Sequence, residues 1–94
     1  MIVELRPIVY KQLGKIKKAN PKVADKIQTF LKLLESTIQP KALPNAKKMQ
    51  GASDERYRFR VGEYRIIAII KDNELIIEVI KIATRQGAYK YRKG

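Results

Sequence analysis

The sequence predicts a small α+β domain: an N-terminal strand, an αα-hairpin, and then three antiparallel strands that form one sheet packed on the helices. Apolar residues recur at helical spacing between residues 9 and 34. Residues 56–89 instead alternate apolar and polar side chains around two short turn sequences. The chain has 94 residues, enough for one modest core, so we expect residues 1–94 to form a single domain.

The first part of the chain is expected to form one strand and two helices. Ile2–Leu5 is a short apolar run, and Pro7 suits the first turn of a helix that ends around Ala19. Asn20-Pro21 then restarts the chain as an N-cap and a favoured first helical residue. The positions expected to face the sheet are Val9, Leu13, Ile16, Val23, Ile27, Phe30, Leu31, Leu34 and Ile38.

The first predicted hairpin turns at Gly62-Glu63, a two-residue Gly-X loop typical of a type II′ turn. Directly paired residues share a face of the sheet, because side chains alternate along each strand. The expected pairs are Val61 with Tyr64, Arg60 with Arg65, Phe59 with Ile66, and Arg58 with Ile67. One face then carries Tyr57, Phe59, Val61, Tyr64, Ile66, Ala68 and Ile70, and we expect it to be the core face.

The opposite face is predicted to gather Arg58, Arg60 and Arg65. Arg60 directly across from Arg65 is unfavourable in isolation, since like charges at cross-strand positions repel. Such a cluster favours an anion, and the planar arginine fork suits phosphate. The alternative interpretation is a solvated basic face without a ligand.

The second hairpin is expected to turn at Asp72-Asn73, a weaker signal because neither residue is glycine. This register adds Leu75, Ile77 and Val79 to the core face and places Glu78 opposite Ile67. On the arginine face it predicts an apolar patch, which would mark a binding site for a partner unless the C-terminal tail or the 39–55 connection covers it. The patch consists of Ile67, Ile69, Ile76, Ile80 and Ile82.

The amino-acid composition limits the kinds of partner and of catalytic chemistry that we expect. The chain has 21 basic and 9 acidic side chains, a net charge of +12, which indicates nucleic acid, an acidic protein or an anionic membrane as partner. We expect no membrane association, because no apolar run approaches about 20 residues, and the MIVELRP start is unlike a signal peptide. Cysteine and histidine are absent, so we expect no disulfide, no metal, no cofactor and no histidine-based catalysis.

Two further segments lack a clear periodic pattern. Pro40 and Pro44 prevent a continuous helix in the connection from Gln39 to Gly51. Residues 81–94 contain five basic residues and no acid, with Tyr89 and Tyr91 among them. Charge with interleaved aromatic rings can bind single-stranded RNA, although a basic tail can equally have no such role.

Three stretches together resemble the RelE/ParE toxin superfamily of type II toxin–antitoxin systems, and its RelE-like branch in particular. They are KKMQG (47–51), YRFRVGEYRIIAII (57–70) and IIEVIKIATRQGAY (76–89). The resemblance implies a cytoplasmic, ribosome-dependent mRNA endoribonuclease in which a 2′-hydroxyl attacks the adjacent phosphate. The positions that match the family's catalytic residues are Arg58, Arg60, Arg65, Arg85 and Tyr89.

The same resemblance implies partners: an acidic antitoxin on the isoleucine patch, and mRNA in the ribosomal A site. Lys47, Lys48 and Lys90 are expected to contact RNA or the ribosome. Many members carry histidine where Thr84 stands, and some carry lysine at the two strand arginines. Arginine is a poor general base, which leaves Tyr89 as the best candidate, with Glu63 and Glu78 weaker. The alternatives are a ParE-like inhibitor of DNA gyrase and a non-catalytic RNA-binding protein.

Overall fold

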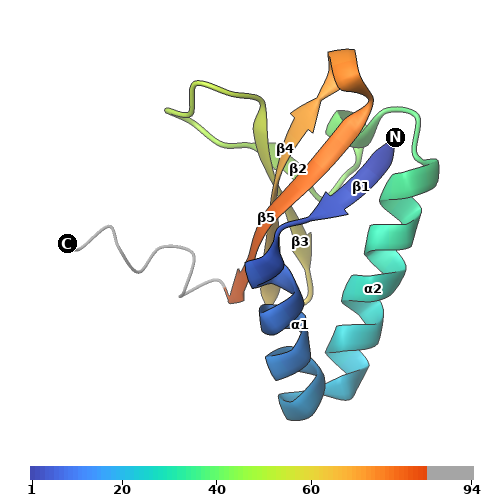
Figure 1. The fold of residues 1–94 in the computed structure, drawn as a ribbon, viewed down its shortest axis with the longest axis vertical. Helices are drawn as coiled ribbons and strands as arrows, with labels where there is room; N and C mark the ends of the chain where they lie inside the picture. The colour runs from blue at the N-terminus through green and yellow to red at the C-terminus, as the bar shows by residue number, and fades with distance from the viewer. Residues whose placement is uncertain (85–94) are drawn as a thin grey trace.

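The computed structural model describes residues 1–84, and within them two helices pack against one five-stranded sheet (Figure 1). The order of elements along the chain confirms the predicted α+β fold. No helix in this part of the chain is long and apolar enough to cross a membrane. The elements are β1 (Ile2–Leu5), α1 (Pro7–Ala19), α2 (Pro21–Ser36), η1 (Pro40–Ala42), β2 (Ala46–Lys48), β3 (Arg56–Val61), β4 (Tyr64–Lys71), η2 (Asp72–Glu74) and β5 (Ile76–Thr84).

The strands lie in the order β1-β5-β4-β3-β2. β1 runs parallel to β5, whereas the other neighbours are antiparallel. The first and last strands of the described chain, β1 and β5, thus pair with each other at one edge of the sheet. At the other side, the connection contributes a short strand, β2, which the sequence analysis treated as part of a loop.

Both helices lie on the same side of the sheet (Figure 1). The Asn20 side chain caps α2 by accepting a hydrogen bond from the Val23 amide at 3.3 Å, as predicted. The expectation for Ile38 is wrong: α2 ends at Ser36, and Ile38 is 90 % exposed. The buried core combines Val9, Ile16, Ala24, Ile27, Leu31 and Leu34 of the helices with Phe59, Ile66, Ala68, Ile70, Ile77, Val79 and Ile82 of the sheet.

The first hairpin has the predicted register, including Arg60 opposite Arg65 and Arg58 opposite Ile67. Gly62 has φ +60°, the left-handed conformation that the first position of a type II′ turn requires and that glycine adopts without steric cost. The turn sequence alone therefore determined which side chains share a face here.

The second hairpin differs from the prediction. Its loop has four residues, because η2 covers Asp72–Glu74 and Leu75 supplies the left-handed residue at φ 57°. Lys71 consequently pairs with Ile76, and Glu78 faces Ile69 instead of Ile67. Leu75 is exposed in the loop, so its predicted place in the core is wrong. Without a glycine in the tight-turn position, the longer loop with a single left-handed residue is favoured.

A β-bulge interrupts the pairing of β4 with β5. Ala68 pairs with Val79 but Ile67 pairs with Lys81, which leaves Ile80 as the extra residue. A bulge reverses the inward and outward alternation beyond it. Ile82 therefore lies in the core beneath the helices, contrary to its expected place on the arginine face, and Lys81 lies on the opposite face.

Candidate nucleic-acid interface

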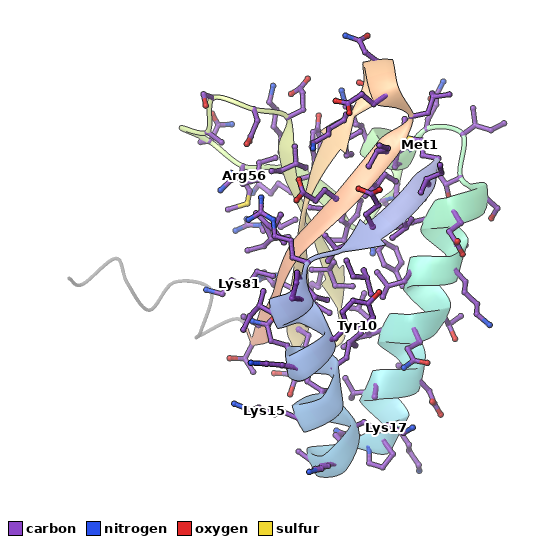
Figure 2. The ribbon with its side chains drawn as sticks, in the orientation of Figure 1. Met1, Tyr10, Lys15, Lys17, Arg56 and Lys81 are labelled. Atoms are coloured by element: carbon purple, nitrogen blue, oxygen red, sulfur yellow. The ribbon has the colours of Figure 1, made fainter. Side chains whose placement is uncertain are left out.

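Basic residues cluster on the sheet face that points away from the helices, and we call this cluster the basic face. The strand pairs place its members: Lys47 lies beside Arg58, and Arg60 lies beside Arg65. Figure 2 shows Arg56 and Lys81 on this side of the sheet, away from α2. The structure thus brings together the three predicted strand arginines and adds Lys47 from β2. The basic face consists of Lys47, Arg58, Arg60, Arg65 and Lys81.

An open pocket of about 750 Å³ lies over Lys47 and the three arginines of the basic face. One wall is held by two hydrogen bonds between Asn45 and Arg60: the Asn45 side chain donates to the Arg60 carbonyl at 3.0 Å, and the Arg60 amide donates to the Asn45 carbonyl at 3.1 Å. These bonds fix the segment before β2 against β3. The lining residues are Pro44, Asn45, Ala46, Lys47, Arg58, Arg60, Gly62, Glu63 and Arg65.

Arg65 distinguishes this pocket from a solvated charged surface. Its side chain is 9 % exposed, and its Nε is buried without a hydrogen-bond partner in the described part of the chain. Leaving a buried charged donor unsatisfied costs free energy that a protein ordinarily avoids. Arg65 also lines the pocket, so an anion there would meet its positive charge, and the geometry favours an anionic ligand beside Arg65.

The two lysines of β2 point to opposite sides of the sheet. Lys47 pairs with Arg58 and lines the pocket. Lys48 pairs with Tyr57, and its Nζ lies 2.9 Å from Glu55 Oε2. This hydrogen bond raises the pKa of the Lys48 ammonium and lowers the pKa of the Glu55 carboxyl. Lys47 therefore lies at the candidate site, whereas the expected role of Lys48 in RNA binding stays a prediction.

The predicted exposed isoleucine patch is wrong in its central part. Ile67 and Ile69 are only 6 % and 8 % exposed. In β4, Ile67 lies directly opposite Arg58 of β3, and Ile69 lies opposite Arg56. Arginine stems can cover neighbouring apolar surface in this way. Ile76 and Ile80 are partly exposed, Ile80 at the bulge. The assignment of these four isoleucines to antitoxin binding stays a prediction.

Glu78 and Glu63 are the two weaker candidates for the general base. Glu78 accepts a hydrogen bond from Arg6 at 2.8 Å and lies 3.3 Å from Lys71 Nζ. The Arg6 guanidinium thereby holds the pKa of the Glu78 carboxyl below its ordinary value, which suits local charge balance better than proton abstraction. Glu63 lines the pocket from the turn. Residues 1–84 contain no group of three or more acidic side chains that could hold a metal ion.

Three predicted site residues, Arg85, Tyr89 and Lys90, lie outside the described residues. Lys81 is the residue that the sequence analysis missed. Simple alternation along β5 predicts that Lys81 shares a face with Val79. The bulge moves Lys81 to the opposite face, and the local sequence contains no signal that predicts the bulge. The signal is present only in the pairing of β5 with β4.

Comparison with known protein sequences identifies the family of this chain. The family model described as the ParE toxin of the type II toxin–antitoxin system parDE matches residues 3–89. A curated relative from Methanocaldococcus jannaschii, named "Putative toxin RelE1", is 34 % identical over 88 residues, which cover 94 % of this chain and 93 % of the relative.

Solved structures agree with this match. The RelE–RelB complex from Pyrococcus horikoshii OT3 contains a chain with a TM-score of 0.71 and 27 % identity, over 89 % of this chain and 93 % of that one. Isolated Escherichia coli RelE toxin has a TM-score of 0.65 at 20 % identity, over 98 % and 94 % of the two chains, and shows the shared fold alone. The fold, the order of motifs and the family match lead to one conclusion: the chain belongs to the RelE/ParE superfamily of type II toxin–antitoxin toxins.

Proposed function

We propose that this toxin is a ribosome-dependent endoribonuclease that binds the scissile phosphate of mRNA on the basic face. The observation that carries the proposal is Arg65, a largely buried arginine with an unsatisfied Nε, which lines a pocket beside Arg58 and Arg60. A phosphate there would accept hydrogen bonds from arginine forks preorganised by paired strands. The net charge of +12 also favours a polyanionic target.

The proposed chemistry uses the RNA's own 2′-hydroxyl. The 2′-oxygen loses its proton and attacks the adjacent phosphorus, the bond from phosphorus to the 5′-oxygen breaks, the departing 5′-oxygen takes up a proton, and a 2′,3′-cyclic phosphate remains. Arg58, Arg60 and Arg65 offset the negative charge that develops on the phosphoryl oxygens. The arginines cannot accept the 2′ proton at neutral pH, which leaves Tyr89 as the best candidate for that step, and the family resemblance adds Arg85 to the site. No metal ion or cofactor takes part.

The proposal includes an acidic antitoxin as the regulatory partner. Relatives of known structure include complexes of RelE with RelB and of YoeB with YefM. An acidic segment over the basic face would occupy the phosphate site, and the opposite net charges would accelerate association. The toxin would act in the cytoplasm, where translating ribosomes present mRNA in their A site.

A second candidate is inhibition of DNA gyrase, which is favoured by the matching family model, that of the ParE toxin. The two candidates predict different damage in cells. The endoribonuclease produces new mRNA 5′ ends within coding regions, whereas a gyrase inhibitor produces gyrase-linked DNA breaks. If neither product appears while RNA binding is retained, the remaining candidate is a non-catalytic RNA-binding member of the family.

The test is brief induction of the toxin followed by mapping of mRNA 5′ ends, compared with an Arg65→Ala variant. Arg56→Ala is the matched control, because Arg56 lies on the same side of β3 but is paired with Asp54 at 2.9 Å and lies outside the pocket. We expect cleavage by the wild type and by Arg56→Ala, and loss of most cleavage by Arg65→Ala. Unchanged cleavage by folded Arg65→Ala protein would contradict the assignment of the site.

A further inference from the structure

We propose that the RNA backbone crosses the strands of the basic face from Lys47 to Lys81, and that Lys81 binds a second phosphate next to the one at Arg65. This inference rests on the proposed function and extends its site beyond the pocket. It makes Lys81 an RNA-binding residue and defines the path of the bound RNA across the strands of the sheet.

The first step is the register. Two adjacent rows cross the sheet at the end nearer Gly62. One contains Lys47, Arg58, Ile67 and Lys81. The other contains Arg60, Arg65 and Ala83. These rows hold five basic residues and no acidic residue, so the positive charge extends across β2, β3, β4 and β5.

Acidic side chains lie at the other end of the same face. Arg56 pairs with Asp54, and Lys71 pairs with Glu78. Glu4 of β1 lies beside Glu78 in the next strand. A polyanion crossing the sheet is therefore attracted to the two basic rows rather than to the end near η2.

The second step is distance. Neighbouring strands lie about 4.7–4.9 Å apart, so Lys47 and Lys81 are separated by three intervals, or about 14–15 Å. Side chains stand roughly perpendicular to a sheet, so upright Lys47 and Lys81 side chains contact different phosphates of an RNA strand that lies across it. Arg65 and Lys81 are diagonal neighbours at about 7–8 Å, within reach of long side chains.

The third step is how Lys81 comes to this face. The bulge at Ile80 turns it away from the core side, and bulges near functional sites commonly redirect a side chain in this way. Beyond the bulge, the Gln12 side chain of α1 accepts a hydrogen bond from the Ile82 amide at 2.7 Å. This bond holds the strand segment next to Lys81 where β1 no longer pairs with β5. The fold thus both reorients Lys81 and fixes its backbone.

The test measures the salt dependence of binding to a fluorescent single-stranded decauridylate. For single strands, the logarithm of the association constant falls by about 0.7 per phosphate contact for each tenfold rise in salt. We expect Lys81→Gln to reduce this slope by about 0.7, and Lys81→Arg to retain it because the charge remains. Lys71→Gln is the matched control, since Lys71 lies on the same face but at the far end of β4 from the two basic rows, and its slope should equal that of the wild type.

A wild-type slope for folded Lys81→Gln would overturn this inference, while mRNA cleavage that depends on Arg65 would leave the proposed function standing. Equal slope losses in Lys81→Gln and Lys71→Gln would also overturn it, because the effect would then be general charge. If the wild-type protein binds no RNA and produces no mRNA ends, both proposals fail. Circular dichroism of each variant separates loss of binding from loss of fold.

Discussion

The two faces of the sheet are built from the same strands but serve opposite purposes. On one face Phe59, Ile66 and Ile77 are fully buried beneath α1 and α2. On the other, one residue away along β3 and β4, Arg60 and Arg65 line an open pocket. Because side chains alternate in a strand, a single chain segment stabilises the fold with one set of residues and presents charge with the next. Substitutions on the two faces should therefore separate stability from activity.

The largest expected effect is on the helix-covered face. Phe59 is fully buried, and its ring lies 5.3 Å from that of Phe30. Phe59→Ala should lower the free energy of unfolding by about 3–5 kcal/mol, through lost burial and the cavity left behind. Its neighbour Arg60 points to the basic face, and Arg60→Ala should change stability by less than about 0.5 kcal/mol. Urea unfolding monitored by circular dichroism measures both; similar losses would contradict the division between faces.

On the basic face the main effect should be on activity. Arg65→Ala should reduce mRNA cleavage by about 10²–10³-fold, the range for losing a preorganised donor to transition-state charge. Its stability should change little, because removal of the unsatisfied Nε offsets the lost packing of the side-chain stem. Arg65→Lys keeps the charge but lacks the fork, so intermediate activity is expected. The comparison fails if Arg65→Ala unfolds the protein as severely as Phe59→Ala.

Gln12 offers a way to test whether the two faces are coupled. It reaches from α1, on the core side, to the Ile82 amide beyond the bulge. Gln12→Leu should cost about 1–3 kcal/mol of stability, because a partly buried N–H loses its acceptor. Hydrogen exchange at the Ile82 amide, measured by NMR, should accelerate in the variant while amides of the β3–β4 hairpin keep their protection. Unchanged exchange at Ile82 would mean that the bond does not hold β5.

The smallest expected effect is on stability at acidic pH, through the ion pair between Arg6 and Glu78. The hydrogen bond from Arg6 lowers the pKa of Glu78 in the folded protein below the ordinary value of 4.5. The pairing therefore stabilises the protein above that value, and its contribution is lost as the pH falls through the lower folded pKa. Both partners are partly solvated, so we expect less than about 1 kcal/mol. In urea titrations across this pH range, Glu78→Gln should show a weaker decline in stability than the wild type; identical declines would exclude the pair as a contributor.

The two hairpins explain how much of the site could be predicted. At Gly62-Glu63 the turn chemistry is strong, and the pairs of β3 with β4, including Arg60 with Arg65, agree with the prediction. At Asp72-Asn73 the signal is weak, and the loop is two residues longer than expected. A shift of two residues preserves the alternation, so Ile77 and Val79 still reach the core. The bulge does not preserve it, and this is why Ile82 and Lys81 were misplaced.

The sequence by itself determined the helical hairpin, the first β-hairpin and the clustering of Arg58, Arg60 and Arg65, because caps, turns and alternation act between residues close along the chain. Only the tertiary structure decided the parallel pairing of β1 with β5, the addition of β2 and the face of Lys81. The first depends on hydrogen bonds between segments far apart in the chain, and the other two depend on how neighbouring strands align, which no turn signal specifies. A bulge has no local sequence signal when the strand on either side of it is apolar, since both registers bury isoleucine, and the choice falls to packing beneath the helices.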